Sequence, residues 1–350
     1  MNNIDKIFMQ RCLDLAAIGK GQTYPNPMVG SVIVYNGKII GEGYHKKCGG
    51  PHAEVNAVNS VKDKSLLKNS TLYVNLEPCA HQGRTPACST MIINEKILRV
   101  VIGSSDNFEK VNGKGIAMLQ NAGIDVTVGV LEEQCRKLNR RFFTYNEKKR
   151  PYIILKWAMT IDGFIDFKRT PDTPIQPNWI TDDYAKILVH KWRSEEMAIM
   201  VGTNTAEKDN PSLNVREWHG QSPVRIVLDK NLRLNKTLDL FNSQIKTVVY
   251  TEQKKESRKN LEFYTTPFDN NLLDNIFKDL YQREIQSVII EGGAQLLNSL
   301  IKIGLWDEAR VFMGEKLFLE GIKAPSIKLL PNNILNFGKN KLLTYNNYKL

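Results

Sequence analysis

The 350-residue sequence lacks several features that would assign a protein to a class directly. It has no apolar run near the roughly 20 residues needed to cross a bilayer, so we expect a soluble protein without a membrane partner. The stretch MNNIDKIFMQRCLDLAAIGKGQ (1–22) predicts an amphipathic helix and shows no secretory signal pattern. Five cysteines, an odd number with uneven spacing, argue against a disulfide framework, and we therefore expect a cytoplasmic protein.

The sequence also has no low-complexity segment, no internal repeat and no concentrated basic tract. The formal net charge is +11, but the lysines are scattered and the longest basic run is Lys148, Lys149 and Arg150. We interpret this charge as a solvated surface rather than a nucleic-acid-binding patch. At about 150 residues per domain, the length predicts two domains.

The first part of the chain has the pattern of helices alternating with strands. Two apolar runs between 30 and 45 are joined by Asn36 and Gly37, a strong hairpin signal. A helical stretch then begins near 53, and strands are expected at 71–76, 99–104 and 124–129, with helices from about 87 and 113. This alternation predicts an α/β domain.

A second alternation begins after the polar, basic stretch 136–151, and we place the domain boundary there, between 1–147 and 148–350. We expect Thr181 to be the N-cap of a helix with Asp182 and Asp183 in its first turn, and another helix near 271–283. Strands are expected at 152–159, 197–202, 224–229, 246–251, 287–293 and 308–314. The second domain should therefore also be α/β.

Two short stretches, PHAEVNAV (51–58) and EPCAHQGRTPAC (77–88), bring together residues that suit a catalytic zinc. Such a zinc has three protein ligands of the Cys and His type and keeps a fourth position for water. His52, Cys79 and Cys88 supply that number, and Glu54 could carry a proton to and from the reacting groups. The pattern H-x-E followed by P-C is typical of zinc deaminases.

The second cysteine departs from the general deaminase signature P-C-x-x-C. Eight residues, AHQGRTPA, separate Cys79 from Cys88, and His81 within them is a rival ligand. Cys48 is more typical of a loop, and Cys12 and Cys135 have no ligand partners nearby in sequence. A non-catalytic zinc scaffold is a further alternative, although a structural zinc site would have no use for Glu54.

The second half has no G-x-G-x-x-G, so the common dinucleotide fingerprint is absent. In VIIEGGAQLLNSL (288–300), two glycines separate an apolar strand from a helix. The N–H groups at the start of such a helix can bind a phosphate, and glycine lets the phosphate approach the backbone. A tight strand-to-helix turn would explain the same glycines. The stretch VGTNT (201–205), after another apolar strand, has the same character.

The motifs YPNPMVGSVIV, HAEVNAV and NLEPCAHQGRTPAC resemble the deaminase half of the bifunctional deaminase and reductase family of riboflavin biosynthesis. LKWAMTIDGFI, WIT, VGTNTAEKDNPSLNVR and VIIEGGAQLL resemble the reductase half in the same order. The resemblance implies a cytidine-deaminase-like N-terminal domain and a dihydrofolate-reductase-like C-terminal domain. The segment DFKRTPDTPIQPN (166–178) departs from the family, which has a short Gly/Ser-containing loop before WIT.

The resemblance also implies the site residues and cofactors. Zn²⁺ would be bound by His52, Cys79 and Cys88 with Glu54 as proton shuttle, and the deaminase substrate by Asn26, His81 and Arg84. NADPH would be bound by Ala158, Trp179, Thr205, Asp209, Gly293, Ala294, Gln295, Leu296, Leu297, Asn298 and Ser299. The reductase substrate would be bound by Arg193, Leu213, Arg216 and Glu291.

The sequence therefore predicts an enzyme that catalyses two consecutive steps of riboflavin biosynthesis. The first is hydrolytic deamination of 2,5-diamino-6-(5-phosphoribosylamino)pyrimidin-4(3H)-one, and the second is NADPH-dependent reduction of the ribosyl group of 5-amino-6-(5-phosphoribosylamino)uracil. We expect small-molecule substrates, no nucleic-acid partner and a homo-oligomer. The alternative is a zinc deaminase acting on a nucleic-acid base, which the positive charge would favour but which leaves the second domain without a purpose.

Overall fold

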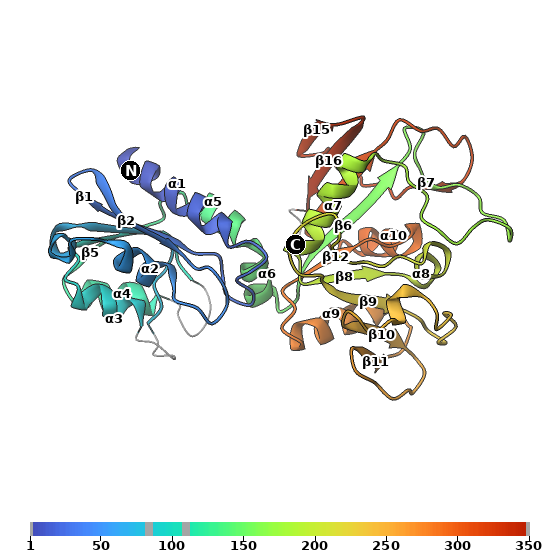
Figure 1. Cartoon of the computed structure of the whole chain (residues 1–350), viewed down its shortest axis with the longest axis horizontal. Helices are drawn as coiled ribbons and strands as arrows, with labels where there is room; N and C mark the ends of the chain where they lie inside the picture. The colour runs from blue at the N-terminus through green and yellow to red at the C-terminus, as the bar shows by residue number, and fades with distance from the viewer. Residues whose placement is uncertain (1–2, 81–86, 107–112, 348–350) are drawn as a thin grey trace. The chain divides into compact units, whose positions relative to one another are not determined.

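The computed structural model describes residues 3–80, 87–106 and 113–347, and the chain divides into two compact units, Met1–Lys149 and Arg150–Leu350 (Figure 1). None of the helices in these described ranges is long and apolar enough to cross a membrane. Each unit contains one main β-sheet with helices on both faces. The expected α/β class is therefore confirmed for both halves.

Unit 1 contains a five-stranded sheet in the order β2-β1-β3-β4-β5. The hairpin turns at Asn36 and Gly37, as predicted, and both residues have positive φ, which the turn requires. Strand β3 is antiparallel to β1 and parallel to β4, which is parallel to β5. The elements are α1 (Asn3–Ile18), β1 (Gly30–Tyr35), β2 (Lys38–Tyr44), α2 (Ala53–Ser60), a 3-10 helix (Lys64–Asn69), β3 (Thr71–Leu76), α3 (Cys88–Asn94), β4 (Arg99–Ser104), α4 (Lys114–Asn121), β5 (Asp125–Val128), α5 (Glu132–Leu138) and α6 (Arg140–Lys148).

Helices cover both faces of this sheet because its strands are apolar on both sides (Figure 1). Val32, Val34 and Tyr73 pack with residues of α1 and α5 on one face. Ile33 and Leu72 are the sequence neighbours of Val32 and Tyr73, and they pack with residues of α2, α3 and α4 on the other face. The alternation follows from the two-residue period of a strand.

Unit 2 contains a nine-stranded sheet in the order β11-β10-β9-β8-β12-β6-β13-β16-β15. The strands from β11 to β13 are parallel, and the hairpin of β15 and β16 adds two antiparallel strands beside β13. The elements are β6 (Tyr152–Met159), β7 (Phe164–Asp166), α7 (Asp183–Glu195), β8 (Ala198–Val201), α8 (Thr203–Asp209), β9 (Val224–Leu228), a 3-10 helix (Asp239–Phe241), β10 (Thr247–Thr251), β11 (Leu261–Thr265), α9 (Leu272–Gln282), β12 (Ser287–Ile290), α10 (Ala294–Ile303), β13 (Glu308–Met313), β14 (Ile322–Lys323), β15 (Asn333–Phe337) and β16 (Asn340–Asn346).

Two apolar clusters hold unit 2 together, one on each face of its sheet. Helices α7 and α8 contribute to one cluster, and α9 and α10 contribute to the other. The expected N-cap of α7 was wrong by one residue: Asp182, not Thr181, caps the helix and accepts a hydrogen bond from the Ala185 N–H at 3.0 Å. Asp182 stands three residues before Ala185, the spacing at which an N-cap carboxylate meets a free N–H of the first turn.

Candidate metal centre and cofactor cavity

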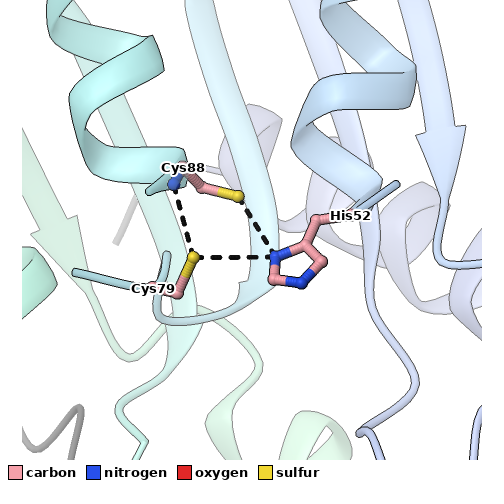
Figure 2. Close-up of side chains that lie close together, drawn as sticks. All are labelled: His52, Cys79 and Cys88. Carbon is pink, nitrogen blue, oxygen red and sulfur yellow. Dashed lines mark hydrogen bonds between the residues drawn. The ribbon is translucent and has the colours of Figure 1, made fainter. Parts of the chain in front are cut away.

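Three metal-ligating side chains meet beyond the carboxyl end of β3 in unit 1. His52 is the residue before α2, Cys79 follows β3, and Cys88 is the first residue of α3 (Figure 2). Among the described residues, these three form the one group of His, Cys, Asp or Glu whose ligand atoms all lie within 4.8 Å of one another. The structure thus brings together the three residues that the sequence predicts as zinc ligands.

The distances between these atoms suit a tetrahedral zinc ion. The Nδ1 atom of His52 lies 3.6 Å from the Cys79 sulfur and 3.3 Å from the Cys88 sulfur. With usual Zn–S and Zn–N bond lengths, tetrahedral geometry requires about 3.6 Å between such nitrogen and sulfur atoms. The residues present therefore fit the ion without a large rearrangement.

The two thiols differ in their electrostatic environment. The backbone N–H of Cys88 donates to the Cys79 sulfur at 3.3 Å, and the Cys79 carbonyl accepts from the N–H and the hydroxyl of Ser89. Hydrogen bonding from Cys88, together with His52, lowers the pKa of the Cys79 thiol to about 4. The pKa of Cys88 is raised because its thiol donates to Cys79 and is buried. A zinc ion would replace the proton that the two sulfurs share.

Glu54 lies beside this cluster, in the first turn of α2, and only 3% of its surface is exposed. Burial raises the pKa of its carboxyl to about 6. A carboxyl with a pKa near neutrality can both accept and donate a proton at physiological pH. Glu54, His52 and Cys79 line a cavity of about 240 Å³, and Asn26 lines it as well.

His45 is a residue of this cavity that the sequence analysis missed. Its Nδ1 lies 3.0 Å from the carbonyl oxygen of Pro51, which can only accept, so Nδ1 carries the proton. Its Nε2 then accepts from the side-chain amide of Asn26 at 3.1 Å. Burial lowers the pKa of His45, which agrees with a neutral ring. As one of only five histidines, seven positions before His52, it could have been singled out.

Glu77 fixes the segment between β3 and Cys79, the predicted zinc ligand. Its buried carboxylate accepts backbone N–H bonds from Asp106 at 3.1 Å, Gly113 at 3.2 Å, Gly115 at 3.0 Å and Ile116 at 3.3 Å. A Cβ atom on Gly115 would lie 2.0 Å from the carbonyl oxygen of Pro78, so only glycine allows α4 to approach so closely.

The other residues proposed for this site are only partly described. His81, as substrate contact or rival ligand, and Arg84 lie outside the described residues. Cys48 is exposed and does not belong to the ligand cluster. Cys12 and Cys135 are buried in the core between α1, α5 and the sheet.

A cavity of about 1060 Å³ lies in unit 2 at the carboxyl ends of the neighbouring strands β9, β8, β12 and β6. Ligands of open α/β sheets bind at this edge. Of the predicted cofactor and substrate contacts in this half, thirteen line the cavity: Ala158, Trp179, Arg193, Thr205, Asp209, Leu213, Arg216, Glu291, Gly293, Ala294, Gln295, Leu296 and Ser299. Leu297 is fully buried in the core, and Asn298 is exposed outside the cavity lining.

Glu291 is the centre of a buried charge cluster in this cavity. Its carboxylate accepts from Arg193 through Nε at 3.0 Å and Nη2 at 2.8 Å, and the Lys156 ammonium lies 3.5 Å away. Burial alone would raise the pKa of Glu291, but Arg193 and Lys156 outweigh it and lower the pKa to about 2. Lys156 was not predicted as a residue of this cavity. A lysine inside the apolar run YIILKWAM is nevertheless a recognisable signal of a buried charge.

Two further features of this cavity have no sequence signature. His190 on α7 accepts the backbone N–H of Arg216 at 3.2 Å, and burial, with nearby Arg193 and Arg216, lowers its pKa to about 4. Leu213 has a φ of 46°, a left-handed conformation that costs energy for a branched side chain. Such strained residues cluster at functional sites.

Two family models match the chain, one over the part that contains the metal centre and the other over the part that contains the larger cavity. Residues 2–104 match the cytidine and deoxycytidylate deaminase zinc-binding region, and residues 151–326 match the RibD C-terminal domain. The first match covers His52, Cys79 and Cys88, and the second covers the whole of the larger cavity.

Proteins similar over nearly the full length carry both regions. The riboflavin biosynthesis protein RibD of Aquifex aeolicus (strain VF5) is 39% identical over 362 residues, spanning 99% of this chain and 100% of the relative. RibD of Actinobacillus pleuropneumoniae is 40% identical over 91% of this chain and 85% of its own length. The crystal structure of a diaminohydroxyphosphoribosylaminopyrimidine deaminase/5-amino-6-(5-phosphoribosylamino)uracil reductase from Thermotoga maritima superposes with a TM-score of 0.87 at 35% identity, covering 98% of this chain and 99% of that one.

Proposed function

The chain belongs to the RibD family and is a bifunctional deaminase and reductase of riboflavin biosynthesis, and we propose how its residues divide the two reactions. Residues 1–147 would deaminate 2,5-diamino-6-(5-phosphoribosylamino)pyrimidin-4(3H)-one. Residues 148–350 would reduce the ribosyl group of 5-amino-6-(5-phosphoribosylamino)uracil to a ribityl chain. The observation that carries the proposal is the convergence of His52, Cys79 and Cys88 beside the buried Glu54.

In the deaminase unit, His52, Cys79 and Cys88 would hold a Zn²⁺ ion. When bound, zinc supplies Lewis-acid activation of water. The carboxylate of Glu54 would take a proton from the attacking water and deliver it to the departing 2-amino nitrogen, so that ammonia leaves. Its raised pKa of about 6 supports this double role.

Substrate orientation in the same cavity would depend on Asn26. Because its amide donates to His45, the orientation of that amide is fixed, and its oxygen is the atom suited to accept from a substrate N–H. The resemblance adds His81 and Arg84 as contacts, and a guanidinium at position 84 would suit the substrate phosphate. Arg84 stands where the family often has lysine.

In the reductase unit, the cavity of about 1060 Å³ would bind NADPH together with the substrate. The nicotinamide cofactor, when bound, supplies a hydride, and the protein positions it against the ribosyl carbon. Gly293 precedes α10, so a cofactor phosphate could approach the backbone there. The proposed cofactor contacts are the predicted residues that line the cavity, namely Ala158, Trp179, Thr205, Asp209, Gly293, Ala294, Gln295, Leu296 and Ser299.

The proposed substrate contacts of the reductase are Arg193, Leu213, Arg216 and Glu291. An ionised carboxylate has about four acceptor positions, so Glu291 can bind Arg193 and Lys156 and still accept from a pyrimidine N–H. The arginines suit the ribose phosphate. Lys156 adds a buried cation to the same wall.

We further propose a cytoplasmic homo-oligomer whose partners are these small molecules, without a nucleic-acid partner. The nucleic-acid deaminase considered as an alternative is not favoured, because near full-length relatives carry the reductase region together with the deaminase region.

The decisive experiment uses Glu54→Gln, which keeps the size of the side chain but cannot carry a proton. Deamination should fall by at least ~10²-fold while zinc stays bound. Supplied with the already deaminated intermediate, the variant should oxidise NADPH at close to the wild-type rate, and supplied with the diaminopyrimidine it should oxidise almost none. Equal slowing of both reactions, with zinc and folding intact, would show that the two units do not act as separate sites.

A further inference from the structure

Residues 167–178, between β7 and Trp179, make up most of the segment that departs from the family, and the side chain of Arg169 joins them to other parts of unit 2. Most residues of the segment are exposed, including Pro171, Pro174 and Pro177. Phe167, Arg169, Thr173 and Asn178 are less exposed, and only 7% of the Arg169 side chain is accessible to solvent. Long cationic side chains are rarely buried without partners, so the contacts of Arg169 define how this segment is placed.

Arg169 makes four hydrogen bonds that join three parts of unit 2. Its Nε donates to Asp166 at the end of β7 at 2.8 Å, and its Nη1 donates to the Gln176 carbonyl at 3.2 Å, across the segment. At the end of α8, the Lys208 carbonyl accepts from Nη1 at 2.8 Å and the Asp209 carboxylate accepts from Nη2 at 2.6 Å.

These contacts use the shape of a guanidinium. Arginine offers five N–H groups in a rigid plane, whereas lysine offers a single point of charge. The last carbonyls of a helix have no partner within the helix, and a cation stabilises that end. The side chain of Arg169 therefore donates hydrogen bonds both to a carbonyl at the end of α8 and to two carboxylates.

The prolines and a local turn stiffen the segment around this anchor. The Thr173 N–H donates to the Thr170 carbonyl at 3.0 Å, which closes a turn with Pro171 at its second position. Proline fixes φ and reduces the number of conformations that the free segment can adopt. The segment is thus restricted along its length and fastened to α8 by Arg169.

The anchored segment is part of the wall of the larger cavity. Asp166, Arg169, Pro177 and Asn178 all line it. Asn178 donates to the same Asp166 carboxylate that binds Arg169, at 3.3 Å, and is followed directly by Trp179. Two proposed cofactor contacts, Trp179 directly after the segment and Asp209 on α8, are therefore connected through Arg169.

We propose that Arg169 is a positioning residue that fastens the 167–178 segment to the end of α8, so that Trp179 and Asp209 form one preorganised wall of the cofactor cavity. The inference rests on the proposed function, namely a reduced nicotinamide cofactor in this cavity. Arg169 acts through these two residues and does not itself take part in the chemistry. In this chain the arginine compensates for the longer, proline-containing segment.

The test compares full-length Arg169→Ala with Lys168→Ala, which removes the same charge from the neighbouring exposed position. In the cofactor-free protein, hydrogen exchange of peptides covering 167–178 should become faster in Arg169→Ala only. Quenching of tryptophan fluorescence should show NADPH binding weakened by about tenfold, the size of one lost charge-assisted hydrogen bond. The reductase KM for NADPH should rise similarly while kcat stays within about threefold, and deamination should not change.

Arg169→Lys keeps the positive charge but loses the planar set of N–H donors, so its NADPH binding should remain weakened. This variant serves as the same test if Arg169→Ala does not fold. Unchanged NADPH affinity in a variant with faster exchange would overturn the proposal, because Arg169 would then only stabilise the segment. Unchanged exchange together with unchanged affinity would overturn it as well. Wild-type protein that does not bind NADPH would overturn the proposed cofactor instead, a result distinguishable because exchange of the segment is measured without it.

Discussion

Replacing Glu291 with glutamine should destabilise unit 2 through loss of a buried charge cluster. Arg193 and Lys156 keep the pKa of Glu291 at about 2, against an ordinary value of 4.5. A difference of 2.5 units, at about 1.4 kcal/mol each, corresponds to ~3 kcal/mol in favour of the ionised carboxylate in the folded state. Only 9% of the Glu291 side chain is exposed, so solvent screening removes little of this amount. Glu291→Gln should therefore lower the free energy of unfolding by about 3 kcal/mol at pH 7.

The sign of the pH dependence follows from the lowered pKa. A carboxyl with a lower pKa in the folded state stabilises the protein above its unfolded pKa, and this contribution is lost as the pH falls through the folded value. The difference in the free energy of unfolding between wild type and Glu291→Gln should thus reach its maximum above pH 4.5 to 5. It should narrow to about half by pH 3.

Tryptophan fluorescence can measure this effect in unit 2 alone. All five tryptophans, at 157, 179, 192, 218 and 306, lie after Arg150, so urea unfolding followed by their emission reports this unit. With a slope of about 2 kcal/mol/M, the midpoint should fall by about 1.5 M. Glu315→Gln, at an exposed position of the same unit, serves as control and should not shift the midpoint. Equal midpoints for Glu291→Gln and wild type at pH 7 would refute the reasoning.

Three further predictions concern the metal centre and the cofactor. Cys88→Ser should lose most of the approximately one zinc per chain, because a hydroxyl is a poor substitute for a thiolate, and unchanged zinc by metal analysis would transfer the ligand role to His81 or Cys48. Gly115→Ala would place a Cβ 2.0 Å from the carbonyl oxygen of Pro78, which precedes the proposed ligand Cys79. Zinc should then be lost to a chelator at least ~10-fold faster than from wild type. Equal loss rates would show that α4 does not support the centre. NADPH should be preferred over NADH at low concentration, and equal turnover with both would count against the proposed cofactor.

Much of the α/β framework could be predicted because each strand is a short apolar run. The strands Thr71–Leu76 and Arg99–Ser104 begin and end at the predicted residues. The hairpin of β15 and β16 was not predicted, because NILNF and NKLLTYN are interrupted by polar residues and β15 is largely exposed. The order of strands in each sheet depends on pairing between distant segments, which local patterns do not contain.

The same contrast holds for the candidate site. The cluster of His52, Cys79 and Cys88 could be predicted because zinc restricts the residue types of its ligands and because H-x-E and P-C are local patterns. Arg169 could not be predicted, since its partner Asp209 is forty positions away and nothing near either residue indicates the contact. The positive φ of Leu213 is equally invisible, because leucine is not a residue type that favours this conformation.

The antiparallel hairpin beside β13 has a consequence for producing the reductase unit alone. The matched RibD C-terminal region ends at residue 326, whereas β15 and β16 follow it, and β16 pairs along the whole of β13 while β15 pairs with β16. A fragment cut at that limit would leave β13 as an uncovered sheet edge and would remove Leu342 and Phe337 from their apolar contacts with Phe312. Uncovered edge strands of this kind recruit strands from other molecules. Such a fragment should therefore aggregate when expressed, whereas one that extends through Asn346 should not.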